Sequence, residues 1–144
     1  MKKIESKIIA VDFDDTVVKQ PIGSKYPDVG PTIPEAVTVL KKLVDAGHRI
    51  IVWTVRDESQ DGILKAVLWY HQNNIPLYGI NARPFEESEQ DSKNMRNSKS
   101  PKVRANLYID DAAAGCPLIQ EEGWRPFVDW KEIEKFLIKI GYLA

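Results

Sequence analysis

The regular alternation of short apolar runs with longer helical patterns constrains the fold of this chain more than any other feature. Four runs are apolar and rich in β-branched residues, as buried strands are. They cover 7–13, 48–54, 76–81 and 105–111. A weaker strand pattern covers 125–130, and helical patterns cover 32–47, 58–74 and 130–142. Strands that alternate with helices favour a parallel sheet. The sequence therefore predicts an α/β fold: a Rossmann-like, three-layer sandwich with a mainly parallel central sheet, in a single domain over residues 1–144.

Composition and charge narrow the class of protein. With 43% hydrophobic and 28% charged residues, the 144-residue chain has the mix of a globular domain with its own core. A net charge of −1 supplies no global basic field for nucleic acid or for an anionic membrane surface. No run approaches the ~18 apolar residues of a membrane span, and the amino-terminal residues are interpreted as the lead into a strand. Cys116 is the single cysteine, so no internal disulfide can form, and a reducing, cytoplasmic location is expected.

Polar side chains stand where each predicted strand ends. In open α/β sheets, ligands bind in the crevice outside the carboxyl ends of the strands, so these positions predict a site. The side chains are Asp12 and Asp14 after the first strand, Thr54 and Arg56 after the second, Asn81 after the third, and Asp110 and Asp111 after the fourth. Two separate strands that each end in paired acids are hard to explain as scattered turn residues.

Carboxylates at neighbouring strand ends repel one another unless a cation lies between them. Paired strands are about 4.8 Å apart, so such acids are expected within a few ångströms of each other. Oxygen-only ligands suit Mg²⁺, which prefers to share its coordination shell with a phosphate. An aspartate can then attack a phosphoryl group, and a second acid can exchange a proton with the leaving oxygen. Hydroxyl and ammonium groups can hold the remaining phosphate oxygens. The pattern predicts a site for a metal ion and a phosphate.

Three short motifs, taken in order along the chain, resemble those of the haloacid dehalogenase superfamily of phosphohydrolases. The stretch "DFDDT" at 12–16 is similar to the DxDx[T/V] signature of that superfamily. Thr54, at the end of "IIVWT", is similar to its second motif, and "YIDD" at 108–111 to its fourth. The resemblance runs from residue 7 to about 115. It implies a magnesium-dependent phosphatase that hydrolyses a phosphomonoester through an aspartyl-phosphate intermediate.

The resemblance also implies a role for each matched residue. Asp12 is the expected nucleophile and a Mg²⁺ ligand. Asp14 is the expected acid/base, and its backbone carbonyl is expected to contact the metal as well. Asp110 is expected to bind Mg²⁺, and Asp111 to do so directly, through water, or by orienting the site. Thr54 is expected to hold the phosphate together with a lysine.

The third motif of that superfamily is a lysine upstream of the metal-binding acids. Here it is assigned to Lys102, which lies eight residues before Asp110 (110 − 102). Lys93 and Lys99 are the alternatives. Many members of the superfamily have glycine where this chain has Asp15, but aspartate tolerates unusual backbone angles, so the turn is expected to survive.

The spacing of the motifs leaves no room for the cap domain that many members insert. The 38 residues from Thr16 to Thr54 (54 − 16) already contain a loop, a helix and a strand, and 81–105 is too short for a domain. The chain is therefore interpreted as capless, with mobile loops at 19–31 and 83–101. An open site resembles members that act on large or partly exposed phosphates, including polynucleotide ends, and small sugar-phosphate phosphatases that close their sites by forming homo-oligomers. The expected substrate is a small sugar phosphate or nucleotide first and a polynucleotide end second.

Other interpretations stay open at this stage. Receiver domains of two-component signalling, which are non-enzymatic phospho-acceptors, also combine acids, threonine and lysine on a parallel sheet. Their phosphorylated aspartate follows strand three, however, where this chain has Asn81. A phosphate-binding or partner-binding module on the same fold is a further alternative. Arg56 is interpreted either as a substrate contact or as the partner of Asp57, and Asp110 and Asp111 could cap a following helix.

Overall fold

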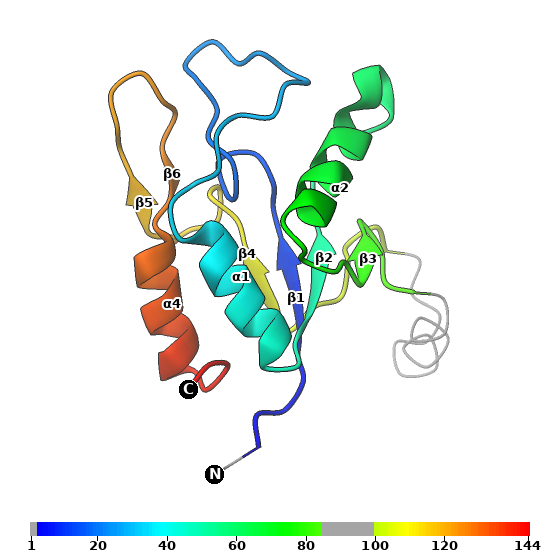
Figure 1. The fold of residues 1–144 in the computed structure, drawn as a ribbon, viewed down its shortest axis with the longest axis vertical. Helices are drawn as coiled ribbons and strands as arrows, with labels where there is room; N and C mark the ends of the chain where they lie inside the picture. Colours follow the sequence, from blue (N-terminus) through cyan, green and yellow to red (C-terminus); the bar gives the residue numbers. More distant parts are fainter. Residues whose placement is uncertain (1–2, 85–99) are drawn as a thin grey trace.

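A four-stranded parallel sheet forms the centre of the protein (Figure 1). The structure is a computed structural model that describes residues 3–84 and 100–144. The strands stand in the order β3 (Gly79–Ile80), β2 (Arg49–Val52), β1 (Ile8–Val11) and β4 (Leu107–Ile109). Every neighbouring pair is parallel, so all four carboxyl ends lie at the same edge. The predicted α/β class with a mainly parallel central sheet is confirmed.

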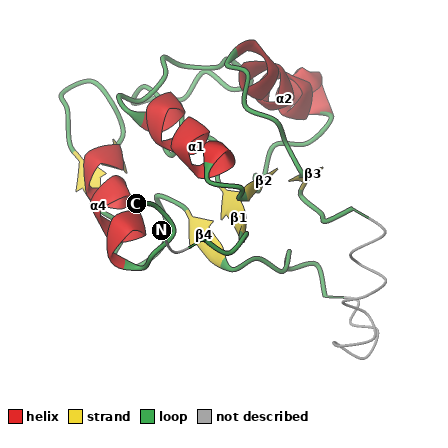
Figure 2. Ribbon diagram, turned by 60° about the horizontal axis from the view of Figure 1, so that its bottom comes forward, coloured by secondary structure: helices red, strands yellow, loops and turns green. Residues whose placement is uncertain are grey.

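Three α-helices of the described residues accompany this sheet. They are α1 (Ala36–Asp45), α2 (Gly62–Gln72) and α4 (Trp130–Lys139). Figure 2 shows α1 and α2 on one side of the sheet and α4 beside β4. Within the described part of the chain, none of the helices has the length and apolar character needed to cross a membrane.

The two faces of the sheet have separate cores, because successive side chains of a strand point to opposite sides. On the helix side, β1 contributes Ile9 and Val11 to a large cluster that includes buried residues of all three helices. On the other side, Ile8 and Ile51 pack with Val103, from the segment that leads into β4. Burial on both faces explains the continuous apolar runs of the strands. This layering is compatible with the predicted three-layer sandwich.

Helix α1 begins later than the sequence pattern predicts. It begins at Ala36, whereas the helical pattern begins at residue 32. The Ile33 N–H donates to the Val17 carbonyl over 2.9 Å, which ties this stretch to the turn after β1. Pro34 therefore precedes the helix.

Helix α2 also begins later than predicted, at Gly62. It follows the short 3₁₀ turn η1 (Ser59–Asp61), in which Gln60 and Asp61 have positive φ angles of 52° and 59°. Two consecutive left-handed residues interrupt a right-handed helix. The helical pattern over 58–74 therefore contains a break that its apolar spacing does not reveal.

The predicted fifth strand is present but lies outside the central sheet. β6 (Phe127–Val128) pairs antiparallel with β5 (Leu118–Ile119), a strand that the sequence pattern does not predict. The Val128 N–H donates to the Asp15 carbonyl over 3.0 Å. This hairpin is thus fastened to the turn after β1 and supports the edge where the candidate site lies.

Candidate active site

Three carboxylates meet where β1 and β4 end. Asp12 follows β1, and Asp110 and Asp111 follow the neighbouring strand β4. One oxygen from each of the three lies within 4.8 Å of the others, and each residue is partly buried. The strand register brings them together, because Val11 pairs with Ile109 and the Asp12 N–H donates to the Ile109 carbonyl over 2.9 Å. We call these three residues the acid cluster.

Among residues 3–84 and 100–144, no cationic side chain is bonded to the acid cluster. Burial, the adjacent Asp111 carboxyl and the charge of Asp110 raise the pKa of Asp12 from an ordinary 3.8 to about 9, against an opposing hydrogen bond from Thr16. Desolvation and like charges both disfavour the ionised form of an acid. Without a cation, Asp12 therefore keeps a proton at neutral pH, whereas a bound cation would favour its loss.

Thr16 links the two strand ends from inside the turn after β1. Its Oγ1 lies 3.0 Å from Asp12 Oδ2 and 3.2 Å from Asp111 Oδ1, and it accepts the Asp111 N–H at 3.1 Å. Thr16 is fully buried, and its carbonyl accepts a 2.6 Å hydrogen bond from the Trp130 indole. The sequence pattern assigned Thr16 no role. Its place in the "DFDDT" motif was the available signal, but its partner Asp111, after β4, lies 95 positions away in the sequence.

Asp14 has a cationic partner of its own. Arg56 donates from Nε to Asp14 Oδ2 and from Nη2 to Asp14 Oδ1, both over 2.7 Å. Gln20 Nε2 donates to the same Oδ1 over 2.5 Å. The side chain of Arg56 is 1% exposed and that of Asp14 is 26% exposed. Asp57, the residue predicted as a partner of Arg56 if that arginine does not contact substrate, instead accepts the Ser59 N–H over 2.8 Å.

Thr54 is held by the end of β3. Asn81 accepts the Thr54 N–H on Oδ1 over 2.8 Å and donates from Nδ2 to the Thr54 carbonyl over 3.0 Å. Asn81 has a positive φ of 52°, which asparagine adopts more readily than most residues. The Thr54 hydroxyl accepts the Arg56 N–H over 3.1 Å. Its own hydrogen can therefore be donated to a ligand, although none of the described bonds joins Thr54 to the acid cluster.

Lys102 lies against a ring and not against the acids. Its ammonium is 5.3 Å from the centre of the Tyr108 ring on β4, and its N–H donates to Ser100 Oγ over 3.2 Å. The side chain is exposed. The alternatives Lys93 and Lys99 lie outside the described residues. The assignment of a phosphate-binding lysine therefore stays a prediction.

Asp15 occupies the turn where the resembled superfamily often has glycine. Its φ is +62°, the left-handed conformation that the glycine would supply. The carboxylate accepts the Gln20 N–H at 3.2 Å and lies 3.2 Å from Arg125 Nε. Burial raises the pKa of Asp15 to about 6, although the Arg125 charge opposes the shift. The extra acid is thus held by local partners.

The donor set of the acid cluster fits a magnesium ion. Mg²⁺ takes oxygen ligands in an octahedron and usually keeps several waters. Asp12, Asp110 and Asp111 offer three carboxylate oxygens at close spacing, and their mutual repulsion is the interaction that a divalent cation relieves. The side chain of Asp14 lies outside this cluster. Its predicted contact with the metal is through the backbone carbonyl, which the Arg56 pair leaves unaffected.

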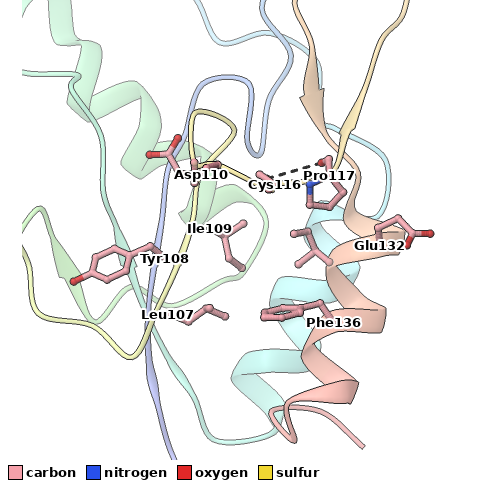
Figure 3. Close-up of a pocket in the computed structure, with 12 residues that line it drawn as sticks. Leu107, Tyr108, Ile109, Asp110, Cys116, Pro117, Glu132 and Phe136 are labelled. Carbon is pink, nitrogen blue, oxygen red and sulfur yellow. Dashed lines mark hydrogen bonds between the residues drawn. The ribbon is translucent and has the colours of Figure 1, made fainter.

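An apolar cavity of about 390 Å³ lies between β4 and α4, next to the acid cluster (Figure 3). Ile109 and Phe136 line it, and Asp110 stands at one end with its carboxylate pointing away from Phe136. Burial and the charges of the nearby acids raise the pKa of Cys116, on the cavity wall, to about 11. Since the thiolate is the reactive form, Cys116 is a poor nucleophile at neutral pH. The cavity therefore adds no reactive group to the site.

These features define the class of the protein as a Rossmann-like α/β domain with an acidic site at the carboxyl edge of its sheet. No protein-family model matches the chain, and no curated protein matches it. The structure of a conserved protein from Bacteroides thetaiotaomicron is similar to this one, with a TM-score of 0.68 and 31% sequence identity. The similarity covers 94% of this chain and 92% of that one. The chain belongs to the same family as that protein.

Proposed function

We propose that this protein is a magnesium-dependent phosphatase of the haloacid dehalogenase type, a phosphoric monoester hydrolase. The acid cluster carries the proposal. Asp12, Asp110 and Asp111 offer oxygens within 4.8 Å of one another at two neighbouring strand ends. Their described side-chain partners are the Thr16 hydroxyl and the Ala112 N–H, and neither of these brings a positive charge. A metal ion and a phosphate together would balance such a site.

In this proposal Asp12 attacks and Asp14 moves the proton. An oxygen of Asp12 bonds to phosphorus while the bond from phosphorus to the ester oxygen breaks. Asp14 gives a proton to that leaving oxygen, which departs as an alcohol. Asp14 then takes a proton from a water molecule that attacks phosphorus, so that phosphate leaves and the Asp12 carboxylate is restored. A bound Mg²⁺ would supply the positive charge that lets two anions approach each other.

The phosphate oxygens need donors, and Thr54 is the first of these. Its hydroxyl accepts one bond from the Arg56 N–H and keeps its hydrogen for a phosphate oxygen. A lysine, assigned to Lys102, is the second donor in the proposal. The substrate we propose is a small sugar phosphate or nucleotide, with a polynucleotide end as the second choice, and the proposed location is the cytoplasm.

Release of inorganic phosphate tests this function. The panel contains an aryl phosphate, sugar phosphates, nucleotides and 3′-phosphorylated oligonucleotides. We expect turnover that EDTA abolishes and Mg²⁺ restores. Turnover that survives EDTA would show that the acids serve another purpose. A stable adduct with acetyl phosphate and no multiple turnover would indicate a phospho-acceptor, and tight phosphate binding without hydrolysis would indicate a binding module.

A further inference from the structure

Arg56 uses all five of its N–H donors. Arginine carries five such donors in a planar fork, and here each has an acceptor. Nε and Nη2 bond to Asp14 as described, Nη1 donates to the carbonyls of Pro27 at 2.8 Å and Gly62 at 3.2 Å, and Nη2 also donates to that of Asp28 at 3.0 Å. With its side chain 1% exposed, the guanidinium is fixed in place and orientation.

The acceptors of Arg56 come from separate parts of the chain. The carbonyls of Pro27 and Asp28 lie in the loop 20–31, within the stretch 19–31 that the sequence predicts to be mobile, and Gly62 begins α2. The guanidinium carbon also lies 5.2 Å from the centre of the Tyr26 ring. A Cβ on Gly62 would lie 2.0 Å from Tyr26 Oη, so loop and helix approach each other too closely for a side chain. Arg56 therefore fastens the loop over the end of β2.

The two oxygens of Asp14 are not equivalent in this arrangement. Oδ1 accepts hydrogen bonds from both Arg56 and Gln20, whereas Oδ2 accepts one from Arg56. Each carboxylate oxygen offers about two acceptor sites, so Oδ2 keeps one that the described bonds do not use. The Asp14 side chain is still 26% exposed. The Arg56 guanidinium thus determines which carboxylate oxygen of Asp14 is available to a ligand, and the plane in which the carboxylate lies.

We propose that Arg56 is a positioning residue: it sets the orientation of Asp14 and holds the loop 20–31 as a fixed wall beside it. The inference rests on the proposed function, in which Asp14 exchanges a proton with the leaving oxygen. Lysine keeps the charge of arginine but is a single ammonium on a flexible stem and cannot form the planar fork. Arg56→Lys therefore separates orientation from charge.

A double-mutant cycle on the Mg²⁺-loaded full chain tests this role. The kcat and KM for an aryl phosphate are measured for the wild type, Arg56→Lys, Asp14→Asn and the double variant. Because a 1 Å misplacement can cost about 100-fold, we expect Arg56→Lys to lower kcat by about that factor, with KM changed less than about twofold. In the Asp14→Asn background, Arg56→Lys should change kcat by less than about twofold, since the group that it orients is already lost.

Arg125→Lys is the matched control. Arg125 also faces an aspartate of the same turn, Asp15, at 3.2 Å, but its side chain is 55% exposed. This variant should keep the wild-type kcat. Mn²⁺ affinity, measured by calorimetry, should be unchanged in Arg56→Lys, because Arg56 bonds to Asp14 and not to the acid cluster. Weaker Mn²⁺ binding would overturn the inference, since it would place the effect of Arg56 on the metal.

A merely structural role for Arg56 predicts a different cycle. The loss of kcat would then be the same with Asp14 present or replaced, and that additive result would overturn the inference while leaving the phosphatase proposal in place. A wild type that releases no phosphate would overturn the proposed function itself and this role with it. If Arg56→Lys unfolds below the assay temperature, Arg56→Gln, which keeps an amide donor, is expected to give the same non-additive cycle.

Discussion

The two sides of the carboxyl edge of the sheet hold their acids in opposite ways. Where β1 meets β4, Asp12, Asp110 and Asp111 offer one oxygen each within 4.8 Å of one another. The neutral Thr16 is the shared partner of Asp12 and Asp111. Where β1 meets β2, Asp14 receives two hydrogen bonds of 2.7 Å from the buried Arg56. One side contains its own cation. The other leaves its negative charge without a cationic partner among the described residues.

This contrast separates a part of the edge that stabilises the fold from a part that is suited to bind a ligand. A fully bonded arginine holds a loop, a helix start and an aspartate in one arrangement, whatever is bound. In the acid cluster, by contrast, burial and the neighbouring acids raise the pKa of Asp12 to about 9. The ionised form of Asp12 is therefore unfavourable at neutral pH. Perturbed acids of this kind gather at functional sites, where a ligand or metal compensates for them.

Replacing Asp12 should have the largest effect. Asp12→Asn keeps the shape of the side chain but removes the attacking carboxylate, so turnover of an aryl phosphate should fall by roughly 10⁴-fold or more. The melting temperature in EDTA should not fall, because the neutral amide replaces a side chain whose ionised form the neighbouring acids disfavour. Asp57→Asn, at an exposed acid bonded to Ser59, is the control that should keep full activity. An active Asp12→Asn variant would exclude Asp12 as the nucleophile.

The acid-cluster side of this edge could be predicted from the sequence because it depends on strand register alone. Each buried strand appears as an apolar run, parallel strands place their carboxyl ends together, and acids directly after two such runs must meet if the strands are neighbours. The pairing of Val11 with Ile109 satisfies that condition. The unusual turn was also predictable, since Asp15 adopts the positive φ expected of a residue in place of glycine.

The Arg56 side could not be predicted, because its contacts depend on how a loop folds back. Arg56 bonds to residues 42 and 29 positions away, Asp14 and Pro27, and no periodic pattern connects them. Local spacing suggested the adjacent Asp57 as the partner of Arg56. In the structure, Asp57 instead accepts the Ser59 N–H. The position of Lys102 on the Tyr108 ring could not be predicted for the same reason, because it depends on the path of the segment before β4.

Replacing Arg56 should lower stability on the side of the edge where β1 meets β2. Arg56→Met leaves Asp14 without its cationic partner and removes the bonds of Arg56 to the loop 20–31 and to the start of α2, so the free energy of unfolding should fall by about 3 kcal/mol. This is the lower end of the range for a broken buried pair, because the Asp14 side chain is 26% exposed. Urea unfolding measures the loss. Arg125→Met, at a pair whose arginine side chain is 55% exposed, should cost less than about 1 kcal/mol. Equal losses in the two variants would contradict the distinction drawn between the two pairs.

Magnesium should stabilise the folded protein by binding to the acid cluster, where β1 meets β4. A ligand at 100 times its Kd adds about 2.7 kcal/mol to the free energy of unfolding. For a chain of this size that corresponds to a rise of roughly 5–10 °C in the melting temperature. Thermal unfolding with and without Mg²⁺ measures the rise. Asp110→Asn should abolish it, whereas Asp14→Asn should keep it, because the Asp14 side chain lies outside the acid cluster. If Asp14→Asn abolished the rise and Asp110→Asn kept it, the metal would bind where β1 meets β2 and not at the acid cluster.

Per pH unit, the pH dependence of stability should show the smallest but most specific effect. The pKa of Asp12 rises from 3.8 to about 9 on folding without metal. Between these values the native state keeps a proton that the unfolded state has lost, so the free energy of unfolding falls as the pH rises. One such group contributes a slope of up to about 1.4 kcal/mol per pH unit. Urea unfolding in EDTA, from pH 5 to pH 8, measures that slope.

The contribution of Asp12 is isolated by comparison with Asp12→Asn. Asp15, whose pKa rises to about 6, contributes a falling stability of the same sign below that pH, but it does so in both proteins and cancels in the difference. The stability of the wild type relative to Asp12→Asn should therefore decrease steadily up to pH 8. Saturating Mg²⁺ should reverse the trend, because metal binding requires deprotonated ligands and strengthens as they lose protons. Parallel curves for the two proteins in EDTA would mean that the acid cluster is not short of positive charge, and the contrast between the two sides of the edge would not hold.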